Sequence, residues 1–306
     1  MKKNTQVDIV IVGGSFAGLS SAMALGRSRR NVLIIDSGKP CNAQTPHAHN
    51  LIGHDGEAPS AIAKKALEQV LNYPTVKLVA GNVVNVTGES GKFKIITEQG
   101  DEYQASKILL ATGVRDIPLP IPGFADCWGI SVLHCPYCHG YEVRDEPLGI
   151  IANGDIGFDF AGLIHHWSQQ LSVFTNGPSS FSAEQRSRLN AREISIIETP
   201  ISAIVHESGL LTHAEFQDQT RIPLKAIFSR AEWVQHSSIP EDLGCTIHSD
   251  GHTRGLIQVN ELGMTSVPGV YAAGDNSSPM RSLAAAIGMG SIAGAALNRE
   301  LIKESF

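Results

Sequence analysis

The sequence predicts an α/β protein built from two βαβ units of the kind that binds dinucleotides. Two observations predict this class: an order of strand, helix and strand patterns that occurs twice, and a glycine-rich turn after the first strand. The first set of patterns falls at residues 7–12, 17–27 and 32–35. The second set falls at residues 148–152, 158–169 and 171–175. Because a domain takes roughly 150 residues, a chain of 306 residues is expected to form two domains.

Further segments extend these two units. The apolar patterns predict a helix at residues 61–71, β-rich segments at residues 77–87, 93–97 and 107–111, a strand within residues 269–275 and a closing helix at residues 282–302. A loop rich in proline follows residue 113. The doubled βαβ pattern is the internal repeat of the chain. The chain contains no low-complexity segment.

The charge balance argues against a polyanionic partner. Charged residues make up 18% of the chain, the formal net charge is -6, and the basic residues form no run. Such a surface does not attract a nucleic acid or an anionic membrane. We therefore expect small molecules or other proteins as partners, with no nucleic acid and no membrane.

The sequence predicts neither a leader peptide nor a membrane span. Lys2 and Lys3 are followed by a short apolar run that contains Asp8, which is typical of a first strand. The most continuous apolar stretch, residues 283–297, is shorter than the roughly 20 residues of a membrane-spanning helix. Five cysteines, an odd number at irregular spacing, favour a reducing compartment. A cytoplasmic location is expected.

The first glycine-rich turn predicts a dinucleotide site. Gly13, Gly14 and Gly18 fit the pattern GxGxxG except that Ser15 takes the place of its middle glycine. Glycines let the backbone approach a pyrophosphate, which a helix N-terminus stabilises. Asp36 follows about 20 residues later, where an acid accepts hydrogen bonds from a ribose. The alternative is a plain strand-to-helix turn, which the combination with Asp36 disfavours.

A pair of cysteines, Cys135 and Cys138, predicts thiol exchange. Pro136 between them favours the first turn of a helix, so both sulfurs lie near a helix N-terminus. Residues three apart on a helix have Cβ atoms roughly 5–6 Å apart, close to the spacing that a disulfide needs. The helix dipole favours the thiolate and lowers a cysteine pKa that is otherwise about 8.5.

Two other interpretations of this pair are weaker. CxxCH, here residues 135–139, is also a haem attachment sequence, but haem attachment requires export and the chain shows no signal peptide. A structural zinc site needs about four ligands, and the chain has no second CxxC. We therefore expect a redox dithiol and no metal.

With these motifs the chain resembles the low-molecular-weight thioredoxin reductase family of pyridine nucleotide-disulfide oxidoreductases. The resemblance covers essentially the whole chain, and it rests on the glycine loop with Asp36, the turn at 111–113, the CxxC, the second βαβ unit and the segment 269–275. It implies two Rossmann-like domains of three layers (ββα) and a homodimer. The FAD domain, residues 1–116 and 247–306, would be split around an inserted NAD(P)-like domain, residues 117–246, that carries the CxxC.

The resemblance also implies roles for residues. Cys138 would face the flavin C4a atom, and Cys135 would be the outer sulfur that exchanges with substrate. FAD would be held by Gly13, Gly14, Ser15, Gly18, Asp36, Ala111, Thr112, Gly113, Gly274, Asp275, Arg281 and Ser282.

The second glycine loop departs from the family pattern. Its first glycine is replaced by Ala152, although Gly154 is in place. Reductases of this family carry basic residues after the next strand that bind the 2′-phosphate of NADPH. Residues 174–180 contain none, and Arg186 and Arg188 come later. These departures count against NAD(P)H as the electron donor.

The residue after the second cysteine points to a particular branch. Thioredoxin reductases usually have an acid there, whereas this chain has His139, and residues 135–142 (CPYCHGYE) are similar to dithiol oxidases of the gliotoxin and holomycin type. An imidazole titrates near pH 6.5 and can take a thiol proton, so His139 is the predicted acid and base. Its alternative is a histidine on a helix surface. His47, His49 and His54 lie in a loop that either lines a substrate entrance or is solvated.

The function predicted from these features is an FAD-dependent oxidation of a substrate dithiol to a disulfide, with O2 as the electron acceptor. An NAD(P)H-dependent, thioredoxin-type disulfide reductase and a ferredoxin-dependent reductase are alternatives with the same chemistry. A flavin-binding redox sensor, in which the CxxC switches an interaction surface, is an alternative of a different class. The partner would be a small-molecule dithiol or disulfide, or a thioredoxin-like protein.

Overall fold

The computed structural model describes residues 5–306, so the predictions made for Lys2 and Lys3 lie outside the described residues. The chain forms two compact units. The first unit comprises Met1–Ala43, Pro59–Arg115 and Trp233–Phe306. The second unit comprises Gln44–Ala58 and Asp116–Glu232.

The first unit is centred on a sheet in the order β3-β2-β1-β6-β5-β4, with β17 also paired to β6. Strands β3, β2, β1, β6 and β17 are parallel, whereas β4, β5 and the first half of β6 form an antiparallel meander. The strands are β1 (Thr5–Val12), β2 (Val32–Asp36), β3 (Val76–Ala80), β4 (Val83–Thr87), β5 (Phe93–Thr97), β6 (Glu102–Leu110) and β17 (Val270–Ala272).

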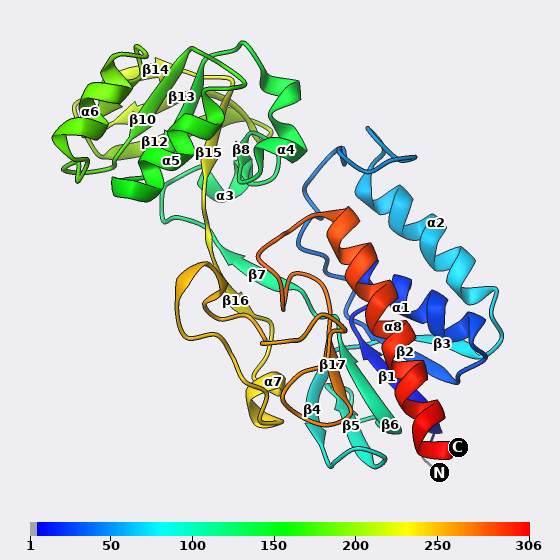
Figure 1. Ribbon diagram of the computed structural model, residues 1–306. Coiled ribbons are helices and arrows are strands. Elements are labelled where there is room, and N and C mark those ends of the chain that lie inside the picture. The colour runs from blue at the N-terminus through cyan, green and yellow to red at the C-terminus, as the bar shows by residue number, and fades with distance from the viewer. Residues whose placement is uncertain (1–4) are drawn as a thin grey trace. The chain divides into compact units, whose positions relative to one another are not determined.

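Helices cover one face of this parallel sheet, and the meander covers the other. The helices are α1 (Phe16–Arg27), α2 (Pro59–Leu71) and α8 (Leu283–Ser305), and Figure 1 shows α8 in red beside α1. Because side chains alternate along a strand, Ile9 and Ile11 pack in the core shared with these helices, whereas Val10 and Val12 pack with the meander. The result is a three-layer domain.

The second unit repeats the same design. Its parallel sheet has the order β11-β10-β9-β15-β8, and an antiparallel meander has the order β12-β13-β14. One core packs against α5, and another packs against the meander. The elements are β8 (Val132–Leu133), β9 (Leu148–Ile151), α5 (Gly154–Ile164), β10 (Leu171–Phe174), α6 (Ala183–Asn190), β11 (Ser195–Ile197), β12 (Ile201–Glu207), β13 (Leu210–Phe216), β14 (Arg221–Pro223) and β15 (Ala226–Ser229).

The predicted fold class, two Rossmann-like three-layer domains, is confirmed. The elements expected from apolar patterns are present within a few residues, with two exceptions: strand β6 begins at Glu102, five residues before the expected start, and helix α5 is shifted. Helix α5 begins at Gly154 and ends at Ile164, whereas the pattern favoured residues 158–169. Asn153 explains the early start, because its side chain accepts a hydrogen bond from the backbone N–H of Gly154 and so caps the helix.

The boundaries of the units differ from the expected 1–116, 117–246 and 247–306 in two places. The return to the first unit comes at Trp233, because the following segment packs there: Ile239 of helix α7 (Ile239–Asp242) and Cys245 join the core beneath the meander. Residues 44–58, which lie between two segments of the first unit in the sequence, have their contacts with the second unit. Sequence order alone does not reveal either contact.

The chain passes between the units along two segments that include strands β7 (Val114–Ile117) and β16 (Glu232–Gln235), and these strands pair with each other. Among residues 5–306, no helix is long and apolar enough to cross a membrane.

Candidate active site

The predicted flavin-binding residues of the first unit lie at one edge of its parallel sheet. Strands β1, β2, β6 and β17 end at Val12, Asp36, Leu110 and Ala272, and each predicted segment lies at or just after one of these ends. Backbone hydrogen bonds hold them together, from Ala111 to Val12 over 2.8 Å and from Ala273 to Leu110 over 3.0 Å. Ligands of open α/β sheets bind at this carboxyl edge.

The glycines of the first loop are required by close backbone contacts. Gly13 has a φ of +105°, and a Cβ atom there would lie 2.3 Å from the carbonyl oxygen of Ala111. A Cβ atom on Gly18 would lie 2.0 Å from the carbonyl oxygen of Gly13. The backbone N–H of Gly14 donates to the Asp36 carboxylate over 2.9 Å. The loop and the acid are therefore one structural unit, as their spacing predicts.

Ser15 departs from the glycine pattern without strain. Its φ is -88°, in a region that any residue adopts. It is the N-cap residue of α1, but its side chain makes no capping hydrogen bond. The N–H groups of the first helical turn thus receive no side-chain cap, which suits a pyrophosphate at this position.

The segment after β17 presents polar groups to the same edge. Asp275 pairs with Arg281 over 3.3 Å, and Ser282 caps α8 by accepting a hydrogen bond from the N–H of Ala285 over 3.1 Å. Asn276 is fully buried and donates to the Thr112 hydroxyl over 3.3 Å. Its side-chain oxygen is buried with no hydrogen-bond partner among residues 5–306.

An orphaned buried oxygen is costly unless a ligand or water satisfies it. Together with the glycine cradle and the uncapped start of α1, it fits a bound dinucleotide such as FAD. The sequence predicted Asp275 as a cofactor contact but did not predict Asn276. A sequence signal was available, because Asn276 directly follows Asp275.

The cysteine pair lies at the start of a short helix, α4 (Pro136–His139), with Cys135 as its N-cap residue and Pro136 in its first turn. This arrangement confirms the helix start expected from the proline. The Cys138 thiol donates to Cys135 Sγ, and the two sulfurs lie 2.7 Å apart. The side chains are therefore aligned for a disulfide between them.

The pKa of Cys135 is lowered to about 7. The largest cause is the hydrogen bond from the Cys138 thiol, which burial opposes, and backbone hydrogen bonds from Cys138 and Tyr137 add to the lowering. The sequence predicted a thiolate that is stabilised at a helix start. The lowering of the Cys135 pKa comes from nearby hydrogen bonds rather than from a helix dipole, because α4 has only four residues.

The pKa of His139 corrects the sequence interpretation. Burial and the nearby charge of His49 lower it from 6.5 to about 4. Burial acts first because desolvation disfavours the imidazolium. His139 is therefore neutral at physiological pH, rather than titrating there as expected. The neutral ring can accept a hydrogen bond or a proton from a thiol, but it does not remain protonated near pH 7.

The structure separates the three loop histidines, which the sequence left undecided. His47 Nδ1 lies 3.0 Å from the carbonyl oxygen of Gly56, and His54 Nδ1 lies 3.1 Å from the Glu57 carboxylate, so both contact their own loop. His49 instead lies 3.6 Å from Glu142, which follows the CxxC helix in η1 (Tyr141–Val143).

The second glycine loop is closed by its own side chains. Asn153 Oδ1 accepts hydrogen bonds from the N–H of Gly154 over 2.8 Å and from the N–H and hydroxyl of Ser180 over 2.9 and 3.1 Å. Its Nδ2 donates to the carbonyl oxygen of Pro178 over 3.0 Å. Asp155 follows in the first turn of α5. A carboxylate at this helix start disfavours a second anion.

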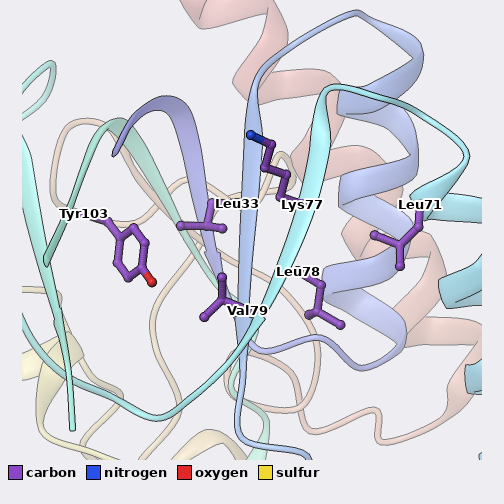
Figure 2. A pocket seen from close by; sticks show the side chains of 6 residues that line it. All are labelled: Leu33, Leu71, Lys77, Leu78, Val79 and Tyr103. Carbon is purple, nitrogen blue, oxygen red and sulfur yellow. The ribbon is translucent and has the colours of Figure 1, made fainter. Parts of the chain in front are cut away.

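A surface cavity of about 580 Å³ lies at the edge strand β3 (Figure 2). Its lining is mainly apolar and contains none of the residues predicted for the site. The lining residues are Leu33, Leu71, Lys77, Leu78, Val79 and Tyr103. The chemistry described above is located elsewhere, at the carboxyl ends of the strands and on α4.

Comparison with known proteins agrees with this geometry. The family model of the pyridine nucleotide-disulphide oxidoreductases matches residues 7–290. The chain belongs to this family. Thioredoxin reductase tcpT from Claviceps purpurea (strain 20.1) is 28% identical over 320 residues, which cover 99% of this chain and 97% of that protein.

Solved structures give the same result. The structure of an oxidoreductase from Agrobacterium tumefaciens is similar with a TM-score of 0.92 and 34% identity, covering 97% of this chain and 99% of that one. The structure of HlmI is similar with a TM-score of 0.90 and 34% identity, covering 98% of this chain and 94% of that one. The protein is thus an enzyme of the thioredoxin reductase-like type, a family that acts on disulfide substrates and uses FAD, with NAD(P)H also found in the family.

Proposed function

We propose that this flavoenzyme oxidises a substrate dithiol to a disulfide through Cys135 and Cys138, with O2 as the final electron acceptor. The observation that carries the choice of direction is the closed second glycine loop. The N–H and hydroxyl of Ser180 donate hydrogen bonds to Asn153 at the N-terminus of α5. A nicotinamide dinucleotide would place its pyrophosphate at this helix start. An enzyme without that nucleotide needs another route for electrons.

Two further features of the same loop support this direction. Residues 174–180 offer no arginine or lysine for a 2′-phosphate. Arg186, the next basic residue, is paired with Glu198 over 2.6 Å. Asp155 is paired with Gln185 over 2.8 Å and keeps a negative charge near the helix start. Residues 174–186 thus offer no unpaired arginine or lysine, and the start of α5 carries a carboxylate.

The first unit is the proposed FAD domain. Gly13, Gly14, Ser15 and Gly18 would hold the pyrophosphate, and Asp36 would bind the ribose. The other proposed contacts are Ala111, Thr112, Gly113, Gly274, Asp275, Asn276, Arg281 and Ser282. When bound, FAD supplies an acceptor for the two electrons of the dithiol and passes them to O2, which leaves as hydrogen peroxide.

The exchange steps follow from the two sulfurs. A substrate thiolate attacks Cys135 Sγ of the oxidised pair, forming a mixed disulfide and releasing the Cys138 thiolate. The second substrate thiolate then attacks the substrate sulfur of the mixed disulfide and releases Cys135. The substrate leaves as a disulfide, the pair holds its two electrons, and two protons are released. A pKa near 7 makes Cys135 a good leaving group in the second step.

His139 is the proposed acceptor for a proton during this exchange. It follows Cys138 directly in α4, and burial keeps its ring neutral, so that a ring nitrogen is unprotonated, although the low pKa makes it a weak base. Because a weak base holds the proton only briefly, His139 would pass it on rather than retain it. The pair and this ring would form the catalytic group of the second unit.

A thioredoxin-type disulfide reductase is the second candidate. The name of the Claviceps purpurea relative favours it, since that protein is called a thioredoxin reductase. The exchange reaction at the same cysteines would then proceed in the opposite direction, with electrons arriving from NAD(P)H. The substrate would be a small disulfide or a thioredoxin-like protein in place of a small dithiol. A homodimer is proposed in both cases, and light scattering would measure its mass.

Oxygen consumption with dithiothreitol, in the absence of any nicotinamide, tests the proposal. The wild-type protein loaded with FAD should consume O2 and form an equal amount of hydrogen peroxide, whereas the variant Cys135→Ser should do neither. Consumption of O2 that persists in the variant would show that free flavin, and not the cysteine pair, is responsible. Absence of consumption in the wild type, together with rapid oxidation of NADPH, would establish the reductase.

A further inference from the structure

We propose that His49 is a positioning residue for thiol exchange: its ring bridges Asp55 and Glu142 and holds the histidine loop, residues 44–58, against the helix that carries Cys135 and Cys138. This inference rests on the proposed function, because it assigns a role in the exchange at those two sulfurs. Both the loop and the helix belong to the second unit of the chain.

The histidine loop is a closed piece of structure. The N–H of Ala48 donates to the carbonyl oxygen of Glu57, and the N–H of Gly56 donates to the carbonyl oxygen of Ala48, each over 2.8 Å. The N–H of Asn50 donates to the Asp55 carboxylate, also over 2.8 Å. These bonds join the two ends of the loop and fix Asp55 within it. The loop is therefore tied together as one piece by its own hydrogen bonds.

His49 attaches this loop to the region of the cysteine pair. Its Nδ1 atom lies 3.6 Å from the Asp55 carboxylate and 3.6 Å from the Glu142 carboxylate. Glu142 lies in the 3-10 turn that follows α4 directly. One ring thus joins a carboxylate of the loop to a carboxylate behind the cysteine helix, and the protonated ring forms an ion pair with both.

A second contact places the start of the loop. A Cβ atom on Gly129, whose φ is +75°, would lie 3.0 Å from the Thr45 hydroxyl. The loop therefore approaches the second unit closely at Thr45 as well as at His49. These two approaches are among its contacts with residues 116–232, although its neighbours in sequence belong to the first unit.

The attachment has a consequence for His139. Burial lowers the pKa of His139, and the proximity of His49 lowers it further. A positive charge on one ring opposes a positive charge on the other. The loop in its attached position therefore brings His49 close enough to influence the protonation of the residue that directly follows Cys138.

The other two loop histidines provide the control. His47 and His54 contact Gly56 and Glu57 of the same loop, whereas His49 contacts Glu142 outside it. Substituting His54 therefore changes charge and size in the loop without removing its attachment. A solvated-loop role for all the histidines would make the His49 and His54 variants behave alike.

Titration of His139 by NMR in the whole FAD-loaded protein is the first test. A midpoint near 4 is expected in the wild type. In His49→Gln it should rise by about half to one pH unit, since burial remains while the charge of His49 is lost. In His54→Gln it should stay at the wild-type value. An unchanged midpoint in His49→Gln would overturn the proposal.

Hydrogen exchange of peptides from residues 44–58 is the second test, and it uses Glu142→Gln as a variant that leaves the loop sequence intact. Exchange should be about two- to fivefold faster in His49→Gln and Glu142→Gln than in the wild type and His54→Gln, the range expected for a partly exposed ion pair. Equal exchange in all four proteins would contradict the bridge.

Alkylation by iodoacetamide separates this inference from the proposed function. Reduced wild-type protein should be modified at Cys135, and a failure there would refute the exchange role of the pair itself. If the wild type reacts at Cys135 while the histidine variants show no change in His139 titration or loop exchange, the cysteine mechanism stands and the role of His49 is wrong.

Discussion

Gly290 of α8 contacts the backbone of α1 at Ala17, where an added Cβ atom would lie 2.1 Å from the Ala17 carbonyl oxygen. Such a distance is far inside van der Waals contact, so the helices approach as closely as they do because residue 290 has no side chain. Ala17 lies in the first turn of α1, within the glycine motif and directly before Gly18. The packing of α8 therefore supports the loop that is proposed to bind FAD.

Replacing Gly290 by Ala should push the two helices apart. We expect a loss of about 1–3 kcal/mol in the free energy of unfolding, the usual cost of overpacking, and a lower FAD content after purification. Gly288→Ala is the matched control, because nothing lies within 4 Å of its added Cβ and the exposed site gains helix propensity. Thermal unfolding and the flavin absorbance measure both effects, and equal behaviour of the two variants would refute the close contact.

Substitution of either cysteine separates chemistry from cofactor binding. Cys135→Ser and Cys138→Ser should each lower dithiol turnover by at least about three orders of magnitude, since the exchange needs both sulfurs. The FAD content should be unchanged, because neither cysteine is among the proposed flavin contacts. Turnover and the ratio of flavin to protein absorbance are the measurements. Full activity in both variants would eliminate the proposed pair.

The hydrogen bond between the thiols sets the pH dependence of Cys135. Alkylation of the reduced protein should increase with pH through a midpoint near 7, because the thiolate is the reactive form and exists above the pKa. In Cys138→Ala the largest cause of the lowering is absent, so the midpoint should move up toward the ordinary value of about 8.5. Mass spectrometry of the peptide containing Cys135 follows the reaction. A midpoint that stays near 7 would show that the backbone hydrogen bonds suffice.

A buried lysine anchors the end of α8. Lys107 of β6 is fully buried, and its ammonium group donates to Ser90, Glu300 and Glu304 over 2.8, 2.6 and 2.5 Å. Lys107→Ala should cost about 2–5 kcal/mol, because it leaves a cavity where a fully buried side chain packs and removes the partner of the partly buried Glu300.

The exposed pair of Lys94 and Glu102, 3.1 Å apart, offers a control for this substitution. Lys94→Ala should change the free energy of unfolding by at most about 1 kcal/mol. Urea unfolding of the two variants would decide the matter. Similar losses in both would mean that the Lys107 network does not anchor the helix.

Local signals were sufficient for the fold and for parts of the site. The glycine loop and Asp36 were predicted from spacing, and Gly13 and Gly14 contact the partners that this spacing requires. Pro136 predicted the start of the CxxC helix. In each case the determining interactions lie within a βαβ unit or a single helical turn, so a short segment of sequence contains them.

Relations that depend on tertiary packing were not predictable. His49 and Glu142 are far apart in the sequence and meet because residues 44–58 pack on the second unit. The lowered pKa of His139 follows from burial and from the proximity of His49, neither of which the motif CPYCHG specifies. The orphaned oxygen of Asn276 likewise becomes apparent only when its neighbours are placed around it.

Anaerobic reduction of the FAD-loaded protein distinguishes a dithiol oxidase from a nicotinamide-dependent reductase. The visible flavin absorbance is followed while dithiothreitol, NADH or NADPH is added separately. We expect bleaching by the dithiol in the wild type, no bleaching by either nicotinamide, no bleaching by the dithiol in Cys135→Ser, and recovery of the colour on admission of air. Rapid bleaching by NADPH or NADH would contradict this expectation, since the closed loop of Asn153 and Ser180 would then bind a nucleotide after all.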